Sequence, residues 1–378
     1  MKRLLPYLVL LSLVLTACVP IPPSLPAASA PAPTPAGVTI AVATAKPAEA
    51  GGEREAQLKK LQALLQSPDF ALEMASWLDA AYYKGQGQTP PPFLTAEEET
   101  KTADKSAKEE KIAINLAGFY ALEAGIGMLS EKTKETPTAI LDSIVKGARP
   151  EADMLLISRF ANATWKAGQP FRSLSRITRD TFRPAALLSK DELKKDFVQI
   201  QAAAEKLLEK MQPIKDQPRE EQLKALQKLL QSSDFALEMA SWLDAAYYKG
   251  QGQTPPPFLT AEEQTKVTAK PVREEKIAIN LAGLYAVEAG IGVLSERTGE
   301  TPVAILEAIA AGKRSNEDML LLARFANATW KAGQPFRSLS RITRDTFRPA
   351  ALLSEEELKK DFEQIKAASA KLLEAMKR

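Results

Sequence analysis

Apolar residues recur with a helical period along most of the chain. Leu58, Leu61, Leu64 and Leu65 share one face of a helix, because residues three, four and seven positions apart lie on the same side. Ser67-Pro68-Asp69 then supplies an N-cap and a first-turn proline for a second apolar series. No alternating run of useful length predicts a strand. The pattern therefore predicts an all-α, bundle-like protein.

Later segments continue this pattern, and each has a start signal. Residues 112–129 are apolar on nearly all sides and rich in Ala and Gly, which favours a core helix in close contact with its neighbours. Asn115 and Glu123 interrupt this stretch, which argues against a membrane span. Further starts are predicted at Thr95 with Glu98, at Thr136-Pro137, at Pro150, at Pro170, and at Ser189 with Glu192 before a last helix to Met211.

The helical module occurs twice, at a spacing of 165 residues. Asp69 to Glu98 is identical to Asp234 to Glu263, and Arg159 to Ser189 is identical to Arg324 to Ser354. Residues 53–217 form the first module and residues 218–378 the second, with about seven helices predicted in each. Gln212 to Gln217 is a polar joint between them. We therefore expect each module to fold around its own core.

The N-terminus has the pattern of an export signal. Lys2 and Arg3 precede a short apolar run that ends in Leu15-Thr16-Ala17-Cys18. These four residues resemble the lipobox of bacterial lipoproteins. The resemblance implies a signal peptide over 1–17, cleavage before Cys18, and fatty acyl chains such as palmitate on Cys18. It places the protein in the bacterial cell envelope, at the outer membrane of a Gram-negative host or the outer face of a Gram-positive cell membrane.

Residues 18–52 contain the lipidated Cys18 and a Pro- and Ala-rich segment with few charges. Such a composition predicts a disordered tether, which reaches on the order of 100 Å in polyproline-II conformation. The acyl chains would hold the protein to a membrane, since each buried CH₂ contributes about 0.8 kcal/mol. The predicted membrane contact is therefore this anchor.

Composition limits the possible chemistry. The formal charge of +3 falls to +1 if Lys2 and Arg3 are removed with the signal, so a nucleic-acid binder is not predicted. The chain has no His and one Cys, which excludes His-ligated metals, Ser-His-Asp and Cys-His catalysis, and internal disulfides. No cofactor is predicted.

An arginine stripe is the most informative candidate site. If 171–183 is helical, its four arginines lie within about 60° of one another. Either the module's own acids, for example Glu97 to Glu99, or an external anion such as a phosphate or carboxylate would neutralise them. The stripe and its copy comprise Arg172, Arg176, Arg179, Arg183, Arg337, Arg341, Arg344 and Arg348.

Two further features are candidates for function. Tyr83 and its copy Tyr248 lie beside a Pro-rich turn, where a ring with a polar tip suits sugar or peptide contact. Glu123 and its copy Glu288 lie within the most apolar helix. A carboxylate there requires a partner, for example Arg159, or serves as the acid of a glycoside hydrolase together with a second carboxylate such as Asp79.

The segment from Trp165 onward is similar to the ryanodine-receptor-type repeat over about 45 residues of each module. Pro184, Leu188, Glu192 and Asp196 carry this resemblance, whereas the family's Gly-Trp-x-Tyr-Gly signature is absent. The resemblance implies a helical interaction module.

Taken together, these features favour a non-enzymatic, lipid-anchored envelope protein that binds an anionic envelope component or another envelope protein. A cell-wall hydrolase that uses Glu123 is the alternative.

Overall fold

The computed structural model describes residues 47–85 and 87–378. It confirms the all-α prediction. The first copy of the module contains α1 (Pro47–Leu65), α2 (Pro68–Gly85), α3 (Ala96–Thr100), β1 (Thr102–Ser106), α4 (Ala107–Thr133), α5 (Pro137–Val145), α6 (Glu151–Arg172), α7 (Lys190–Lys194) and α8 (Phe197–Met211), with 3₁₀ turns η1 (Leu174–Thr178), η2 (Ala185–Leu187) and η3 (Gln212–Ile214).

The second copy repeats this order. It contains α9 (Arg219–Leu230), α10 (Ser233–Gly250), α11 (Ala261–Thr265), β2 (Val267–Pro271), α12 (Val272–Thr298), α13 (Pro302–Ala310), α14 (Asn316–Arg337), α15 (Glu355–Lys359) and α16 (Phe362–Lys377), with η4 (Leu339–Arg341) and η5 (Ala350–Leu352).

Local signals set these boundaries as the sequence predicts. Capping boxes open α3 at Thr95 and α7 at Ser189, and Thr136 caps α5 ahead of Pro137. One expected boundary is wrong. Pro170 does not open a new helix, because α6 continues through it and ends two residues later at Arg172. Pro170 has no N–H to donate to the Lys166 carbonyl, and the helix ends within one turn after it.

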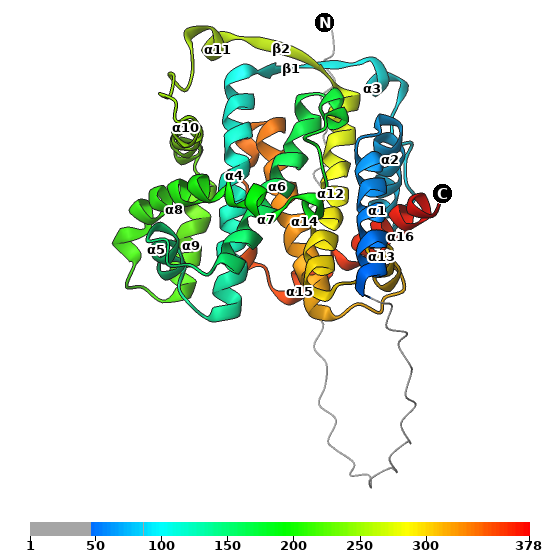
Figure 1. Ribbon diagram of the computed structural model, residues 1–378. Helices are drawn as coiled ribbons and strands as arrows, with labels where there is room; N and C mark the ends of the chain where they lie inside the picture. Colours follow the sequence, from blue (N-terminus) through cyan, green and yellow to red (C-terminus); the bar gives the residue numbers. More distant parts are fainter. Residues whose placement is uncertain (1–46, 86) are drawn as a thin grey trace, which may run out of the picture. The chain divides into compact units, whose positions relative to one another are not determined.

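Four long helices form the centre of the molecule. Helices α4 and α6 of the first copy pack against α12 and α14 of the second (Figure 1). Equivalent residues of the two copies meet here. The rings of Phe160 and Phe325 stack with centroids 4.0 Å apart, and those of Phe171 and Phe336 stack at 5.6 Å. Contact between equivalent residues is the mark of a two-fold interface.

The outer helices are exchanged between the copies. Helices α1 and α2 pack beside α12, α13 and α16 of the second copy, and α9 and α10 pack beside α4, α5 and α8 of the first (Figure 1). One core joins Leu61, Met74 and Leu78 to Leu281 and Ile305. The other core has the reciprocal composition.

The expectation of one self-contained core per module therefore does not hold. Residues 53–217 and 218–378 are sequence repeats, but the described residues of both copies belong to one compact unit. The joint is packed as well. The side-chain amide of Gln222 donates to the carbonyls of Lys215 and Gln217, and its oxygen accepts from the Thr138 hydroxyl at 2.9 Å. Burial of each copy's apolar faces requires the other copy.

The sequence does not predict the two short strands, β1 and β2. They pair with each other in antiparallel register, with Asp104 opposite Ala269, and they cross one end of the central helices (Figure 1). Each strand finds its partner only in the other copy. The sequence of a single module therefore contains no hairpin signal that would predict either strand.

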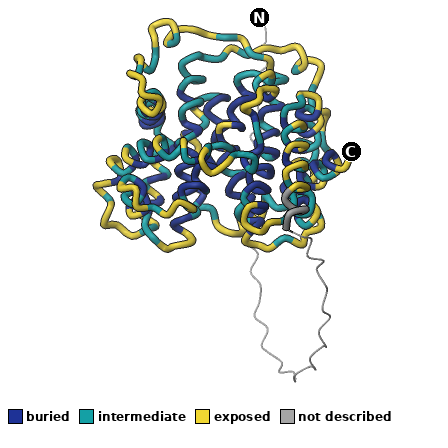
Figure 2. The backbone as a smooth tube through the Cα atoms, viewed as in Figure 1, coloured by how far each residue is buried: buried dark blue, intermediate teal, exposed yellow. Residues whose placement is uncertain are grey.

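Helices α4 and α12 are each long and apolar enough to cross a membrane by composition alone. However, 78% of the most apolar window of each is buried within the protein. Figure 2 shows the same distribution, with burial concentrated in the central helices and exposure at the outer turns. Their apolar character is thus accounted for by their place in the core.

Candidate functional site

Glu123 and Glu288 form buried ion pairs that link the two copies. Glu123 accepts from the Lys331 ammonium and Glu288 from the Lys166 ammonium, and all four side chains are fully buried. Burial lowers the pKa of both lysines, and the facing carboxylates oppose that shift. The predicted salt bridge therefore exists, but its partner is a lysine of the other copy. Arg159 pairs with Glu296 instead.

Each buried pair also fixes the loop that follows η1 or η4. Glu288 accepts from the backbone N–H of Ala185, and Lys166 donates to the Arg183 carbonyl at 3.1 Å. The pair thereby positions the end of the arginine-rich segment. Glu123 has 0% exposure and two committed hydrogen-bond donors, so its carboxylate has no path to a substrate.

The arginine stripe does not form one helix. Arg172 ends α6, Arg176 lies in η1, and Arg179 and Arg183 lie in the following loop. Arg172 pairs with Glu110 at 3.3 Å and Arg183 with Glu192 at 2.6 Å. The second copy repeats both pairs, Arg337 with Glu275 and Arg348 with Glu357. The suggested partners Glu98 and Glu99 instead contact Lys276 and Arg273.

The remaining four arginines of the stripe and its copy make no ion pair within 47–85 and 87–378. These are Arg176 and Arg179 of the first copy and Arg341 and Arg344 of the second. Partial burial lowers the pKa of Arg176, and the positive charges of Arg172 and Arg179 lower it further. Arg341 is perturbed in the same way by Arg337 and Arg344. We call Arg172, Arg176 and Arg179, with their equivalents, the arginine clusters.

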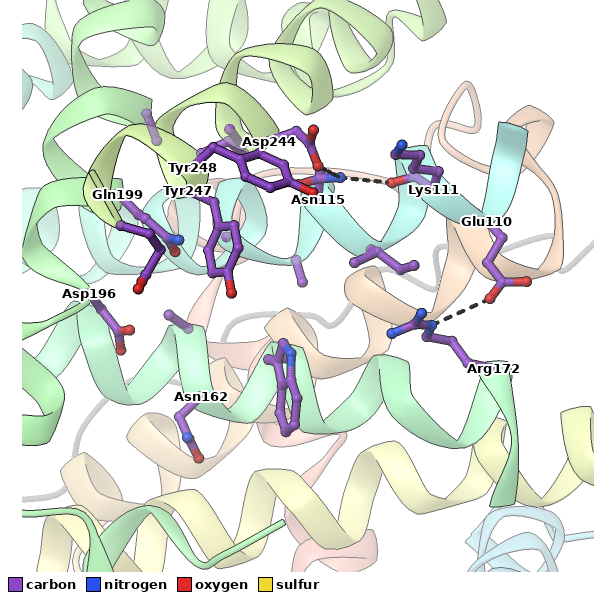
Figure 3. A pocket seen from close by; sticks show the side chains of 18 of the residues that line it. Glu110, Lys111, Asn115, Asn162, Arg172, Asp196, Gln199, Asp244, Tyr247 and Tyr248 are labelled. Atoms are coloured by element: carbon purple, nitrogen blue, oxygen red, sulfur yellow. Dashed lines mark hydrogen bonds and ion pairs between the residues drawn. The ribbon is translucent and has the colours of Figure 1, made fainter. Parts of the chain in front are cut away.

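A cavity of about 840 Å³ lies beside the first arginine cluster, between the two copies. Its walls come from α4, α6 and the start of α8 in the first copy and from α10 and β2 in the second. Arg172 belongs to both the cavity wall and the cluster. In Figure 3, Tyr247 points into the space bounded by Asp196, Gln199 and Asn162, and Asn115 lies beside Asp244.

Hydrogen-bonding groups line this cavity. The Asn115 amide donates to the Lys111 carbonyl at 3.0 Å and to the Asp244 carboxylate at 3.4 Å. The Asn162 side-chain oxygen is buried and has no hydrogen-bond partner among the described residues. Burial raises the pKa of Asp196 to about 6 and also raises the pKa of Asp244. The cavity thus holds one carboxylate, Asp196, that no cation neutralises among the described residues.

The same contacts recur around the second copy's equivalent residues. Asn280 donates to Asp79 at 3.4 Å, the Asn327 side-chain oxygen is again unpartnered among the residues described, and the pKa of Asp361 is also raised to about 6 by burial. Asp79, the second carboxylate of the hydrolase hypothesis, is therefore a hydrogen-bond partner of this amide.

The predicted tyrosine Tyr248 does line the cavity, together with Tyr247. Their rings meet edge to face at 5.6 Å, and Tyr83 meets Tyr82 in the same way at 5.5 Å. Tyr247, Asn162, Asp196 and Trp165 were not predicted as site residues. Trp165 lies near the end of α6 and is 37% exposed. In the sequence, this wall is marked by Asn162 and Trp165, which are three residues apart and so lie on one face of a helix.

A second hollow, of about 570 Å³, lies between α4, α6, α12 and α14. Equivalent residues line it in pairs, with Leu156 and Leu321 on the apolar side. The Arg159–Glu296 and Arg324–Glu131 ion pairs flank it. The four side chains of these two pairs neutralise one another.

Within the described residues, no group of three or more Cys, Asp or Glu side chains is placed to hold a metal ion. Cys18, the signal peptide and the rest of residues 1–46 lie outside the described part of the chain. No family model matches the chain, and neither does a curated protein or a solved structure.

Proposed function

We propose that this protein is a non-enzymatic binding protein, anchored by lipid to the bacterial cell envelope, that retains an anionic envelope component through its arginine clusters. The observation that carries the proposal is that Arg176 and Arg179 make no ion pair among the described residues and lie near Arg172, which lines an open cavity. Cys18 within the lipobox-like Leu15-Thr16-Ala17-Cys18 supports the anchor.

An external anion is the partner that these guanidinium groups lack. Guanidinium groups bind phosphates and carboxylates in a forked geometry, and two or three of them close together raise the local anion concentration. Internal acids already neutralise Arg172 and Arg183. Arg176 and Arg179 have no such partner among the described residues. An anion that binds them therefore displaces water and does not have to break a salt bridge.

Duplication gives the protein two such clusters. Two weak sites on one chain retain a polymeric ligand more strongly than either alone if the ligand can engage both. A repeating envelope polymer that bears carboxylates or phosphates meets that condition. The buried ion pair at Glu123 supports binding rather than hydrolysis, since the acid that the alternative requires is committed to Lys331.

Charge removal tests this proposal. In the full chain, Arg176→Gln, Arg179→Gln, Arg341→Gln and Arg344→Gln together should abolish co-sedimentation with purified peptidoglycan sacculi. The melting temperature should change little, because these side chains are exposed or only partly buried and make no ion pair among the described residues. Lys59→Gln with Lys228→Gln is the control for charge loss elsewhere. Unchanged co-sedimentation would contradict the anion-binding role, and release of soluble fragments would favour the hydrolase.

The anchor is tested separately. Cys18→Ser should release the protein from the membrane fraction or leave it unprocessed, because the thiol is the acceptor of the diacylglyceryl group in lipoproteins that carry this motif. Normal maturation with unchanged membrane association would refute the anchor.

A further inference from the structure

The cavity between α4, α6, α8 and α10 carries two exposed aromatic side chains. Trp165 is 37% exposed and Tyr247 is 50% exposed, although both lie on a cavity wall. Neighbouring rings hold each of them in place. Trp165 packs against Phe182 with centroids 6.4 Å apart, and Tyr247 packs against Tyr248. Aromatic surface that is fixed yet open to solvent is suited to contact with a ligand.

The polar groups of the cavity are acids, amides and cations. Three of its four cations already pair with acids, as Arg172 does with Glu110. Asp196 instead presents a carboxylate that no cation neutralises among the described residues. Gln199 and Asn115 add amide donors and acceptors on neighbouring walls (Figure 3). A hydroxyl donor from a ligand can supply the hydrogen bond that the Asp196 carboxylate lacks.

These two sets of groups together match one ligand chemistry. A sugar ring has C–H groups that pack on the face of an aromatic ring, and its hydroxyls donate to and accept from amides and carboxylates at the ring edge. A purely apolar ligand would leave Asp196 unpaired. A small anion would make no use of Trp165 or Tyr247.

We infer that this cavity is a subsite for a neutral saccharide unit, with Trp165 and Tyr247 as the stacking surface and Asp196 and Gln199 as hydrogen-bonding groups. The inference deepens the proposed function and rests on it, because Arg172 connects the saccharide cavity to the arginine cluster. A glycan that carries carboxylates or phosphates along its length would then occupy both.

The subsite is expected twice on each chain. Trp330 is 38% exposed and Tyr82 is 49% exposed, and these residues correspond to Trp165 and Tyr247. Asp361 repeats the buried carboxylate of Asp196. Each subsite takes its stacking residues from both copies, since Trp165 and Tyr247 belong to different copies. A stoichiometry of two follows.

Calorimetry with an uncharged probe separates this inference from the arginine clusters. The full chain in detergent is titrated with a tetrasaccharide of β-1,4-linked N-acetylglucosamine, and two sites per chain are expected. Trp165→Ala should leave one site, and Trp165→Ala with Trp330→Ala should leave none. Asp196→Ala with Asp361→Ala should weaken binding about tenfold or more, because each site loses the acceptor of a ligand hydroxyl.

Matched controls isolate the cavity. Val198→Ala removes an exposed apolar side chain of α8 outside the cavity lining, and Asn316→Ala removes an exposed amide at the start of α14. Both variants should bind the tetrasaccharide normally. If the tryptophan variants fail to fold, Tyr247→Ala with Tyr82→Ala replaces them, since both rings are half exposed.

Absence of tetrasaccharide binding by the unaltered chain would overturn the saccharide subsite, as would binding that the aromatic variants leave unchanged. Neither result would contradict the proposed function, because retention on sacculi through the arginine clusters is measured separately with the four Arg→Gln changes. Loss of sacculus binding in the arginine variants together with retained tetrasaccharide binding would support both assignments.

Discussion

At the scale of single residues, the buried pairs Glu123–Lys331 and Glu288–Lys166 are the most demanding positions in the molecule. Each lysine is removed from water, so its charge depends on one carboxylate and one backbone carbonyl. Removing one member of a buried pair leaves the other uncompensated, which is costlier than replacing both.

We therefore predict that Lys331→Met lowers the free energy of unfolding by about 3 to 5 kcal/mol. Adding Glu123→Gln should restore most of that loss, since glutamine is neutral and still accepts from the Ala350 N–H. Urea denaturation of both variants measures the difference. Lys59→Met, which breaks an exposed pair with Glu55, is the control and should have little effect. If Lys331→Met leaves the free energy of unfolding unchanged, the buried ion pair is contradicted.

The buried aspartates Asp196 and Asp361 should make stability depend on pH. Burial raises the pKa of Asp196 and Asp361 from 3.8 to about 6. The folded state binds their protons more tightly than the unfolded state does. Their contribution to stability is therefore fully present below pH 3.8 and is lost as the pH rises through about 6.

Asp196→Asn with Asp361→Asn should consequently stabilise the protein at pH 7 by on the order of 1 to 3 kcal/mol per site and flatten the profile between about pH 4 and 7. Urea titrations at a series of pH values check this. Asp180→Asn with Asp345→Asn, both exposed, should leave the profile unchanged. A variant that is less stable than the unaltered protein at pH 7 would show that these carboxylates have partners when ionised.

At the scale of elements, the glycines of α4 differ sharply in what surrounds them. A Cβ on Gly127 would lie 2.9 Å from the backbone nitrogen of Ala351, whereas one on Gly118 would lie 4.0 Å from a methyl of Leu243. Backbone cannot move aside as a flexible side chain can. Gly127 is thus required by the close approach of η5 to α4.

Gly127→Ala should destabilise the protein by about 1 to 3 kcal/mol through overpacking. Gly118→Ala, on the same helix, should instead be neutral or stabilising by up to about 1 kcal/mol, because alanine favours the helix. Thermal melts of the two variants provide the comparison. Equal effects would mean that η5 does not contact α4 as described.

Most elements were predictable because their signals are local. Thr95, Ser189 and Thr136 cap helices through side chains three residues from their targets, so no distant contact decides them. The arginine segment was predictable only in composition. Whether 171–183 forms a helix depends on the Glu288 and Lys166 contacts, which fix Ala185 and Arg183 from the core.

At the scale of the whole molecule, the exchange of outer helices could not be predicted from a repeated sequence. Leu78 packs near Gly283, and Leu243 packs near Gly118, each in the other copy. Packing of each leucine against its own copy would satisfy the same pattern of residue types. The cavity escaped prediction for the same reason, since Trp165 and Tyr247 meet only through this exchange.

An isolated copy should therefore form a homodimer rather than a stable monomer. Residues 47–217 carry α1 and α2 together with the helices that receive their equivalents, so two such chains can reproduce the intact arrangement. Analytical ultracentrifugation should show a dimer, and its melting temperature should rise with protein concentration. A folded monomer whose melting temperature is independent of concentration would show that the outer helices can fold back on their own copy.

The same exchange makes two chemically similar halves mechanically unequal. Helix α1 is the first described element of the chain, yet it is held by the second copy. The Arg54 guanidinium donates to the Ser295 hydroxyl at 2.7 Å, and the Val303 backbone N–H donates to the Gln57 side-chain oxygen at 2.9 Å. Tension on the N-terminal end of the chain thus acts first on those contacts. Helix α9 lies between folded segments in the middle of the chain, so tension on the N-terminal end does not reach it directly. Under load, the core beneath α1 and α2 would open first, while its counterpart remained closed.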